Sequence, residues 1–596
     1  MCGIAGIFAY DPKSAPVDRD ELLRVRDHMQ ARGPDAADMW IAENGRVGFA
    51  HRRLAIIDLS PGGAQPMHDP ETGNWIVFNG EIYNHHQLRA QLIRDGIATR
   101  TLSDTEVLLK LYAQKGAAML TQLRGMFALA IWDARQQHLF FARDVYGIKP
   151  LYIADDGHTL RFASQVKALL VGTVDTRPEP AGHAGFLLWG SVPEPYTLYR
   201  GIRAFPPGHW MTVANGRRSE PVAFDSLSQR LARLPTAAAQ DSQQALQQIA
   251  DAVRDSVAAH MVADVPVGVF LSAGLDSTML AACAAKLGEL RSVTLGFDEY
   301  ANTTYDEAVL AGEVANRLGA QHTLHRISGA DFAKDRAHLL RAMDQPSIDG
   351  INTWFVSKAA ASQGLKVALS GIGGDELFGS YPSFAQVPKL YNTLRRFGGV
   401  PLLNRTVRMG LAAVSGLLPS PKYAGLLEYG SSLGGAYLLR RALYMPWEIA
   451  SVVGRDMATE GLQQLDTQAA LAACKQGIGS QRLAITALES QWFMRNQLLR
   501  DADWAGMAHS LELRVPFVDT TLLDRFIEIP SLNPLQEKAM IARTVAPELP
   551  EAILTRPKTG FAVPIHQWLN PGAHHSVNRH REWAGQLYQH FTQGES

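Results

Sequence analysis

The sequence is poor in cysteine and has no long apolar run. Only three cysteines occur in 596 residues, Cys2, Cys283 and Cys474, which is too few for a disulfide framework and typical of a reducing compartment. No apolar stretch approaches the roughly 20 residues that span a bilayer. The first residues also lack the basic and apolar regions of a signal peptide. We therefore expect a cytoplasmic protein without a transmembrane segment.

An excess of either charge is also missing. The chain has 57 Lys and Arg against 58 Asp and Glu, a formal net charge of -1, so nothing indicates a nucleic-acid partner or an anionic membrane. Hydrophobic residues make up 46% of the chain, which is ordinary for a globular protein. Because single cores rarely grow far beyond about 300 residues, a chain of this length is expected to contain more than one domain.

Two textures divide the chain. Residues 1–215 alternate short apolar runs such as "GIAGIFAY" and "NWIVFNGEIYN" with turn residues, a strand-rich pattern. Residues 236–596 alternate apolar strands with helical stretches, which predicts a doubly wound α/β domain. The polar stretch 216–235 is interpreted as a linker. Residues 381–480, rich in Leu, Arg and Gly, are interpreted as a helical insertion whose basic residues form solvated faces.

The cysteine at position 2 has a chemical option that an internal cysteine lacks. Removal of Met1 would leave the thiol and the α-amine on one residue, Cys2. An α-amine has a pKa near ~8 and can act as the general base for its own nucleophile. A buried structural cysteine is the alternative, and the dipeptide "MC" alone would favour it.

Seven motifs in order favour the catalytic interpretation. They are "MCGIAGIF", "RGPDA", "HRRLAIIDLSPGGAQPM", "FNGEIYNH", "SDTEVLL", "LRGMFALAIWD" and "ARDVYGIKPLY". Together they closely resemble the class II glutamine amidotransferase domain of asparagine synthetases and their relatives. The resemblance implies an N-terminal-nucleophile hydrolase sandwich, with two antiparallel sheets between helices (αββα), and glutamine as the ammonia donor.

The resemblance also implies a role for each residue of this site. Cys2 would attack the glutamine side-chain amide, form a glutamyl thioester and release ammonia. Asn79 and the backbone N–H of Gly80 would form the oxyanion hole, whose donors face the charge that develops in the transition state.

The remaining glutamine contacts are charged. The planar fork of Arg53 suits the glutamine α-carboxylate, while Glu81 and Asp104 suit its α-ammonium. Three nearby histidines are interpreted as structural, because their spacing matches no zinc pattern and an N-terminal nucleophile needs no histidine base. They are His51, His85 and His86.

The stretch "DVPVGVFLSAGLDSTMLAA", residues 264–282, contains the first residues of a second candidate site. It predicts an apolar strand, a Ser and Gly loop and a helix that starts near Asp276. It resembles the SGGxDS pyrophosphate loop of ATP pyrophosphatases, with Ala273 in place of one glycine. Loop N–H groups and the helix dipole suit pyrophosphate, and Asp276 suits Mg²⁺. A generic strand, turn and helix is the alternative.

The stretch "ALSGIGGDELFGSY", residues 368–381, pairs a buried strand with a glycine-rich, acidic loop. The loop has no Lys and so is no Walker A motif. In the resemblance it is the second half of the ATP site, where Ser370 and Gly371 lie near the nucleotide and Asp375 shares Mg²⁺ with Asp276. A divalent ion compensates two carboxylates beside a polyphosphate.

Further residues follow from the same resemblance. Lys558, in "RPKTGF", would neutralise pyrophosphate charge during catalysis. Leu295 and Gly296 would lie near adenine, whereas Glu512 and Arg514 would brace the fold. The full set implied to contact ATP is Leu271, Ser272, Gly274, Asp276, Ser277, Leu295, Ser370 and Gly371.

The resemblance covers nearly the whole chain and implies an asparagine synthetase-like carbon–nitrogen ligase. Glutamine would be hydrolysed in residues 1–215. Ammonia would then pass internally to residues 236–596, where MgATP adenylates an acceptor carboxylate, aspartate in the family. The products would be an amide, glutamate, AMP and pyrophosphate. A homodimer is a family expectation.

Two positions depart from the family pattern S-G-E-G-S-D-E: Ile372 replaces the Glu and Gly374 replaces the Ser. Ile372 can neither accept a proton nor bind a cation, which leaves open a different acceptor, such as a sugar uronate or a peptide carboxylate in polysaccharide or natural-product biosynthesis. A glutaminase that supplies ammonia elsewhere and a non-catalytic regulatory protein on the same fold are further alternatives. Retention of Cys2, Asp276 and Asp375 argues against the last.

Overall fold

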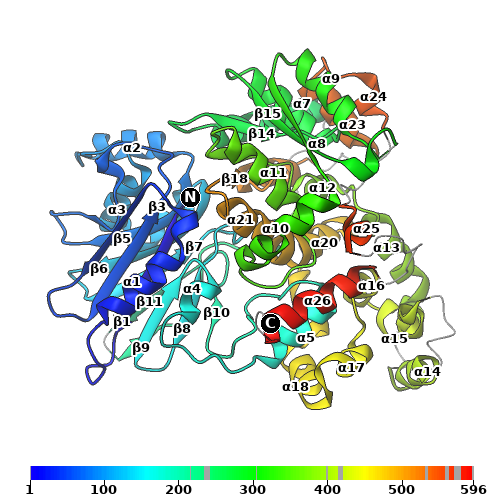
Figure 1. Cartoon of the computed structure of the whole chain (residues 1–596), viewed down its shortest axis with the longest axis horizontal. Coiled ribbons are helices and arrows are strands. Elements are labelled where there is room, and N and C mark those ends of the chain that lie inside the picture. The colour runs from blue at the N-terminus through cyan, green and yellow to red at the C-terminus, as the bar shows by residue number, and fades with distance from the viewer. Residues whose placement is uncertain are drawn as a thin grey trace.

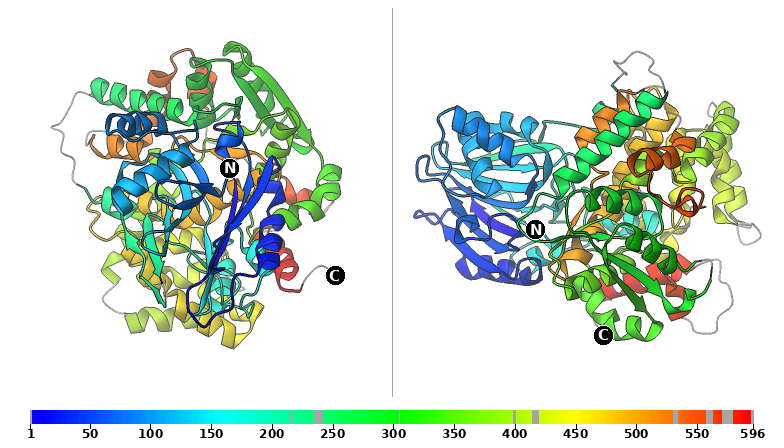
Figure 2. Two further views of the ribbon diagram at one scale, coloured as in Figure 1. Left: turned by 90° about the vertical axis from the view of Figure 1, so that its left-hand side faces the viewer. Right: turned by 90° about the horizontal axis from the view of Figure 1, so that it is seen from above.

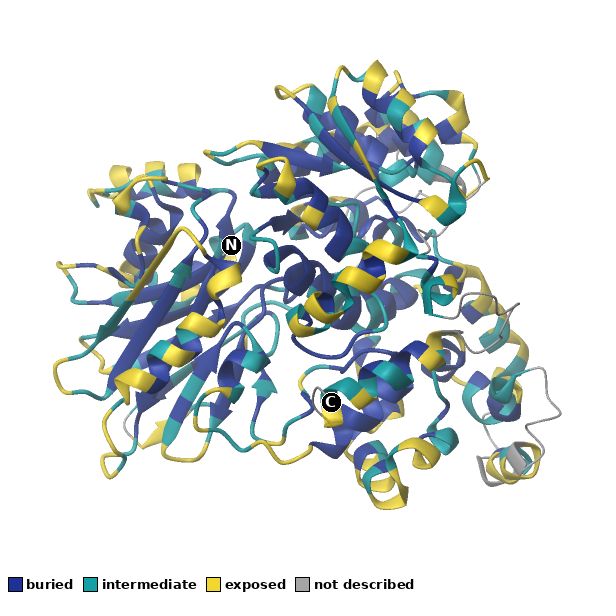
Figure 3. Cartoon of the chain, in the orientation of Figure 1, coloured by how far each residue is buried: buried dark blue, intermediate teal, exposed yellow. Residues whose placement is uncertain are grey.

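The structure is a computed structural model, and Figure 1 and Figure 2 show a sheet-rich N-terminal part lying beside a larger, mainly helical part. The described residues are 2–214, 216–233, 242–303, 305–397, 401–413, 420–529, 534–556, 563–569 and 579–593. Buried residues fill both the sheets and the helices that lie between the two parts, while exposed residues line the outer helices (Figure 3).

Two antiparallel sheets form the N-terminal part. The first is six-stranded, in the order β10-β8-β9-β1-β3-β2, and the second is seven-stranded, in the order β12-β11-β7-β6-β5-β4, with β13 paired to β11. The strands are β1 (Gly3–Ala9), β2 (Ala36–Ile41), β3 (Val47–Arg53), β4 (Met67–His68), β5 (Trp75–Ile82), β6 (Gly125–Asp133), β7 (His138–Arg143), β8 (Tyr152–Asp155), β9 (Thr159–Ala163), β10 (Arg203–Ala204), β11 (His209–Ala214), β12 (Arg217–Arg218) and β13 (Val222–Ala223).

Aromatic residues from both sheets form the central core, because alternate residues of each strand face the opposite sheet. Phe8, Phe49 and Phe141 belong to this core, with Phe162 packed edge-on against the last two. Helices cover the outer faces, which completes the expected four layers. They are α1 (Arg19–His28), α2 (His85–Arg94), α3 (Asp104–Lys115) and α4 (Val166–Leu170).

Two segments of the N-terminal part differ from what the sequence pattern predicted. Residues 216–233, expected as part of a linker, include β12 and β13 of the second sheet and then α6 (Leu227–Leu231). The helix α5 (Pro180–Trp189) leaves the sheets and packs on α18 (Arg455–Leu465), where the Gly461 backbone lies against Pro180. The two parts of the chain are therefore interleaved.

A five-stranded parallel sheet forms the centre of the second part, in the order β16-β15-β14-β17-β18. Its strands are β14 (Val267–Phe270), β15 (Arg291–Phe297), β16 (Gln321–Ile327), β17 (Val367–Leu369) and β18 (Glu512–Arg514). The chain first builds outward from β14 to β16 and then returns to the other side of β14. Ligands of doubly wound sheets bind at such a switch point, beyond the carboxyl ends of the strands.

Helices surround this sheet and continue into a helical region. They are α7 (Ser242–His260), α8 (Leu275–Ala285), α9 (Ala308–Arg317), α10 (Gly329–Ala342), α11 (Ile351–Ser362), α12 (Gly374–Phe378), α13 (Ser383–Leu394), α14 (Pro401–Ala413), α15 (Leu426–Gly430), α16 (Leu433–Arg441), α17 (Ala450–Val453), α19 (Thr467–Cys474), α20 (Gln481–Leu488), α21 (Arg500–Met507), α22 (Thr520–Ile527), α23 (Pro534–Val545), α24 (Glu551–Leu554), α25 (Ile565–Leu569) and α26 (Arg579–Gln593). A π-helical segment, Glu489–Leu499, connects α20 to α21.

None of the helices within the described ranges combines the length and the apolar composition that crossing a membrane requires.

Candidate active sites

The first candidate site surrounds Cys2, at the start of β1. Its backbone N–H donates to Asn79 Oδ1 at 3.0 Å. Asn79 lies on β5 and is completely buried, and its Nδ2 group has no hydrogen-bond partner within the described residues. A buried donor without an acceptor is costly. An oxyanion formed beside Cys2 would give this donor its acceptor.

Gly80 lies too close to the neighbouring strand to carry a side chain. A Cβ at Gly80 would lie 2.1 Å from the carbonyl oxygen of Met126, on the paired strand β6. Any other residue would push the two strands apart. The sequence therefore needs glycine beside Asn79, at the predicted second oxyanion donor.

Two buried carboxylates lie next to these groups. Asp104 begins α3 and accepts a hydrogen bond from the Ile82 N–H at 3.1 Å. Burial raises the pKa of Asp104 to about 6, and burial together with the nearby Glu512 carboxylate raises the pKa of Glu81 well above its ordinary value. An ammonium group between them would favour the ionised forms, as expected for a glutamine α-amine.

Arg53, at the end of β3, is held by backbone carbonyls. Its guanidinium donates to the Ser60 oxygen at 2.9 Å and to the Asp58 oxygen. The loop that supplies these acceptors passes so close that a Cβ at Gly63 would lie 2.1 Å from the Arg53 Nη2. The side chain is therefore fixed in a site where its fork could bind a carboxylate.

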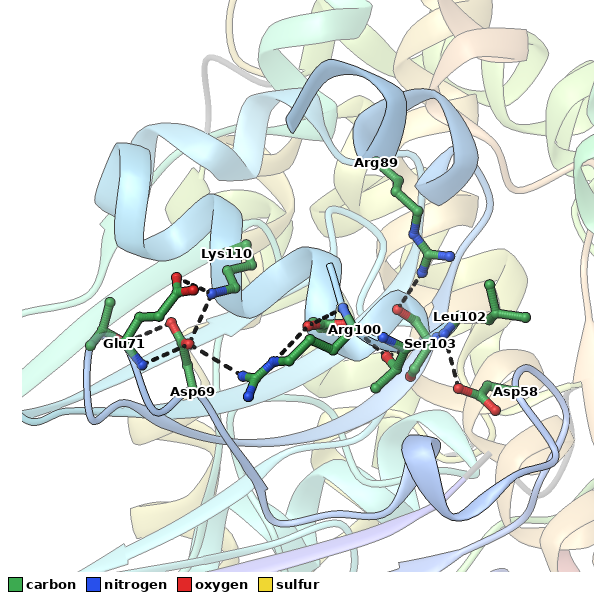
Figure 4. A network of polar contacts seen from close by, with 11 residues as sticks. Asp58, Asp69, Glu71, Arg89, Arg100, Leu102, Ser103 and Lys110 are labelled. Carbon is green, nitrogen blue, oxygen red and sulfur yellow. Dashed lines mark hydrogen bonds and ion pairs between the residues drawn. The ribbon is translucent and has the colours of Figure 1, made fainter. Parts of the chain in front are cut away.

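A polar network fixes the loop before Asp104 (Figure 4). The Leu102 N–H donates to the Asp58 carboxylate at 3.1 Å, and Arg89 donates to the Ser103 oxygen at 2.9 Å. Asp58 thus connects the Arg53 loop to the Asp104 loop. Farther along α3, Lys110 pairs with Asp69 at 2.9 Å, Lys110 also contacts Glu71, and Arg100 lies 3.7 Å from Asp69.

The three histidines interpreted as structural, His51, His85 and His86, belong to no metal-type cluster of the described residues. His51 is buried on β3, and burial lowers its pKa to about 3. His85 Nδ1 lies 2.9 Å from the Ile82 oxygen, and burial lowers its pKa to about 4. Its ring packs against His86. Across the described ranges no group of three or more His, Cys, Asp or Glu side chains is placed to hold a metal ion by itself.

The second candidate site is a cavity of about 720 Å³ at the switch point of the parallel sheet. The loops after β14 and β17 form two of its walls, because these strands are neighbours. All nine residues predicted to contact ATP or the shared metal line it: Leu271, Ser272, Gly274, Asp276, Ser277, Leu295, Ser370, Gly371 and Asp375.

The β14 loop is closed by its own hydroxyls. Ser277 Oγ accepts from the Ser272 N–H at 3.1 Å and donates to the Ser272 oxygen at 2.9 Å. Gly274 then caps α8, whose N-terminus opens on the cavity. This arrangement presents backbone N–H groups and a helix dipole to an anion.

Two carboxylates converge on one cation in this cavity. Lys538, on α23, lies with its Nζ 2.7 Å from Asp276 Oδ2 and 2.9 Å from Asp375 Oδ1. Burial alone would lower the pKa of Lys538, but the two carboxylates hold it above its ordinary value. The carboxylates thus already share a positive charge, and carboxylate oxygens are ligands that Mg²⁺ also accepts.

Comparisons with known proteins agree with this arrangement. The family profile described as "Glutamine amidotransferase domain" matches residues 1–251, and that described as "Asparagine synthase" matches residues 248–588. The "Asparagine synthetase [glutamine-hydrolyzing] 1" of Bacillus subtilis is 32% identical over 99% of this chain and 90% of its own length. The chain belongs to the glutamine-hydrolysing asparagine synthetase family. It is therefore an ATP-using enzyme of the carbon–nitrogen ligase type.

Two more relatives of this family differ in coverage. The "Putative asparagine synthetase [glutamine-hydrolyzing]" of Mycobacterium tuberculosis H37Rv is 33% identical over 96% of this chain and 89% of its own length. "Asparagine synthetase B [glutamine-hydrolyzing]" of Escherichia coli is 32% identical over 65% of this chain and 66% of its own length. A solved glutamine phosphoribosylpyrophosphate amidotransferase of B. subtilis reaches a TM-score of 0.31, too low to support an inference.

No sequence motif of this chain pointed to Lys538. A lone lysine in an ordinary helix carries no signal of its own, and both its partners lie far away in the sequence. Lys558 was predicted instead, and it lies outside the described residues. Gly296 is not among the residues that line the cavity.

Glu512 and Arg514 are completely buried and bonded to each other at 2.6 Å. Arg514 also donates to the backbone oxygens of His260 and Val262, and its Nη2 lies 3.6 Å from Glu81. This pair therefore connects β18 of the synthetase sheet to the end of α7 and to the glutaminase site. Such bonding suits the bracing role predicted for it.

The family member's cavity contains acids beyond the proposed metal ligands. Asp349 and Asp501 line it, as does Ile372 of the β17 loop. Asp501 accepts from Ser347 Oγ at 2.7 Å and from Trp504 Nε1 at 2.8 Å. Burial, followed by the charge of Asp349, raises the pKa of Asp501 to about 7.

Proposed function

We propose that the chain makes an amide from an acceptor carboxylate, with glutamine as nitrogen donor and MgATP as activator. Residues 1–215 act as the glutaminase and residues 236–596 as the synthetase. The Cys2 thiolate attacks the glutamine amide, and ammonia leaves. Water then hydrolyses the thioester to glutamate. Burial raises the pKa of the Cys2 thiol, so a base is needed to deprotonate it. The α-amine exposed by loss of Met1 is the proposed base.

The other groups act by position. Asn79 Nδ2 and the Gly80 N–H receive the oxyanion. Arg53 binds the glutamine carboxylate, and the buried acids Glu81 and Asp104 bind its ammonium. Asn79 supports this half of the proposal. Its Oδ1 accepts a hydrogen bond from the Cys2 N–H, while its Nδ2 has no hydrogen-bond partner among the described residues.

In the synthetase cavity the acceptor carboxylate attacks the α-phosphorus of ATP and pyrophosphate leaves. Ammonia from Cys2 then attacks the acyl-adenylate, and AMP leaves with its oxygen. The loop Ser272–Ser277 and the α8 N-terminus bind pyrophosphate, and Lys558 is proposed to neutralise it. Asp276 and Asp375 would hold Mg²⁺, which neutralises phosphate charge when bound. The main support for this half of the proposal is that the nine residues predicted to contact ATP or the shared metal line a single cavity.

Aspartate is the acceptor suggested by the relatives' names, and a different carboxylate is the second candidate. Ile372 lines the cavity at the position of the family Glu, and an alkyl chain can neither take a proton from ammonia nor bind its cationic form. This observation favours a non-aspartate acceptor such as a sugar uronate or a peptide carboxylate.

A panel experiment tests both candidates. Purified enzyme, glutamine and MgATP are combined with each acceptor, and AMP and the amidated product are measured by mass spectrometry. AMP with aspartate would support the first candidate, and AMP only with another acid the second. Glutamate without AMP for every acid would contradict the ligase and leave a free glutaminase. Neither glutamate nor AMP would favour the non-catalytic alternative.

Cys2→Ala separates the two half-reactions. The variant should lose glutamine-dependent amide formation, because the nucleophile is absent, but should keep formation from free ammonia. Cys283→Ala, which removes another buried thiol, is the control and should behave as wild type. Loss of both activities in Cys2→Ala would contradict the two-site mechanism. Intact mass of the active enzyme shows whether Met1 is removed.

A further inference from the structure

One arginine touches the nucleophile and the synthetase part at the same time. Arg32, at the end of a 3₁₀ turn before β2, donates its Nε–H to the Cys2 carbonyl oxygen at 3.2 Å. Its two other nitrogens bind the Asp503 carboxylate of α21 at 2.6 and 3.0 Å. Arg32 is 1% exposed and Asp503 6% exposed. This contact joins positions 471 residues apart in the sequence.

The two backbone ends of Cys2 are therefore held by different parts of the chain. Its N–H is fixed by Asn79, from the same sheet domain. Its carbonyl is fixed by Arg32, whose planar fork is itself oriented by Asp503. With its nitrogen and its carbonyl oxygen both held, rotation about χ1 then places the sulfur. The placement of Cys2 thus depends on α21.

The other face of α21 belongs to the synthetase cavity. Asp501 precedes Asp503 by two positions, so the two side chains point about 200° apart around the helix. Asp501 lines the cavity, as does Gly350. The cavity wall at Gly350 packs tightly on α21. A Cβ at Gly350 would lie 2.7 Å from the Trp504 ring and 3.1 Å from the Asp501 Cβ.

The segment that leads to Gly350 is bonded to the glutaminase part. Asp344 accepts from the backbone N–H groups of Val166 and Lys167, at 3.0 and 2.9 Å, and so caps α4. Gln345 donates to the Tyr152 hydroxyl at 3.1 Å. A change in the cavity wall would therefore move α21 against Arg32 instead of being absorbed at a loose domain boundary.

We propose that Arg32 is a positioning residue that couples glutamine hydrolysis at Cys2 to the synthetase cavity. The Arg32–Asp503 pair holds the Cys2 carbonyl in the reactive position. Ligands that contact Asp501 and Gly350 in the cavity shift α21, and this shift changes the position of Cys2. The coupling of the two sites rests on the proposed function. The role of Arg32 in placing Cys2 does not, and can be tested separately.

The test measures how fast Cys2 reacts with the glutamine analogue 6-diazo-5-oxo-L-norleucine, followed as the mass increase of the intact full-length chain. Arg32→Lys keeps the charge but removes the fork, and Asp503→Asn removes the charge that orients it. Each should lower the maximal alkylation rate by up to about 100-fold, because small misplacements of a nucleophile have effects of this size. The half-saturating concentration should stay within about twofold, since no glutamine contact is removed.

Matched controls come from a second ion pair of the same domain. Arg161 and Glu21 lie 2.7 Å apart, with side chains 13% and 5% exposed. Arg161→Lys and Glu21→Gln should alkylate at the wild-type rate. If they slow as much as the Arg32 and Asp503 variants, or if those two react at the wild-type rate, the positioning role is wrong.

Two further arms separate coupling from placement and from the overall reaction. MgATP should change the wild-type alkylation rate by at least about twofold and should not change that of Asp503→Asn. An equal response in both would overturn the coupling. AMP formation from free ammonia should survive in Asp503→Asn. If the wild type forms no AMP with any acceptor, the proposed function fails, while the alkylation rates still decide the role of Arg32.

Discussion

At the scale of single residues, Asp501 is a buried carboxylate whose proton affinity differs strongly between folded and unfolded chain. Its pKa rises from 3.8 to about 7 on folding, through burial and then through Asp349. Between these values the folded state holds a proton that the unfolded state has released. The free energy of unfolding therefore falls as pH rises through this window, by about 1.4 kcal/mol per pH unit, and is constant above it.

Asp501→Asn should remove this dependence, because the amide is neutral at every pH. Relative to wild type, the variant should gain stability between pH 4 and pH 7 and show a constant difference above pH 7. Chemical denaturation at several pH values measures this. Asp298→Asn, at an exposed position, is the control. Parallel curves for wild type and Asp501→Asn would contradict the prediction.

The location of site residues could be predicted from sequence where motifs contain them. Cys2, Asn79 and the serine loop stand in short ordered motifs, and the structure brings each group together. Lys538 stands in no motif and could not be predicted in this way. Arg32 stands in the motif "RGPDA", but its pairing with Asp503 could not be predicted, because the partners of both side chains lie far away in the sequence. Their contacts exist only after the sheets and helices have packed.

At the scale of elements, the β14 and β17 loops touch without room between them. A Cβ at Gly374, the first residue of α12, would lie 2.2 Å from Asp276 Oδ1, in the first turn of α8, which follows the β14 loop. The family Ser at this position therefore requires a different placement of Asp276. In this chain glycine allows the Asp276 carboxylate to lie against α12 while it pairs with Lys538.

Gly374→Ala should displace Asp276 and weaken MgATP binding. Overpacking of this kind costs about 1–3 kcal/mol, and tenfold in affinity corresponds to about 1.4 kcal/mol, so the KM for ATP should rise by about 5-fold to 100-fold. Steady-state AMP release measures it. Gly288→Ala, where a Cβ meets no atom within 4 Å, should leave KM unchanged. An unaltered KM in Gly374→Ala would show that the two loops are not rigidly packed.

The apolar pattern correctly predicted a strand-rich first part and, from strands separated by helices, the parallel sheet of the second part. The sandwich followed from the family resemblance and not from the pattern. The placement of α5 did not follow, because "PAGHAGFLLW" is apolar throughout and carries no sign of its partner. Its packing on α18 is decided by tertiary contacts. The strands β12 and β13 were also missed, because two-residue edge strands have too short a pattern to recognise.

At the scale of the whole molecule, Asp519 joins the two parts and begins a helix. Its Oδ2 accepts from the Nε–H of Arg124, in the loop before β6, at 2.8 Å and from Ser256 at 3.1 Å. The same oxygen lies 2.6 Å from Arg124 Nη2. Its Oδ1 caps α22 through the Thr521 N–H at 2.7 Å. Burial alone would raise the pKa of Asp519, but Arg124 and the other partners hold it below its ordinary value. The carboxylate is thus ionised and shared between domain contact and helix cap.

Two substitutions separate these tasks. Asp519→Asn keeps a good N-cap but leaves Arg124 with only the exposed Asp255, so it should lower the free energy of unfolding by about 3 kcal/mol. Asp519→Ala also removes the cap and should lose about 1 kcal/mol more. Glu528→Gln, in the exposed pair with Arg525, should change stability by less than about 0.5 kcal/mol. Urea denaturation followed by tryptophan fluorescence measures all three. Equal effects of Asn and Ala at position 519 would show that the cap contributes nothing, and an Asn variant as stable as wild type would show that Arg124 does not hold the two parts together.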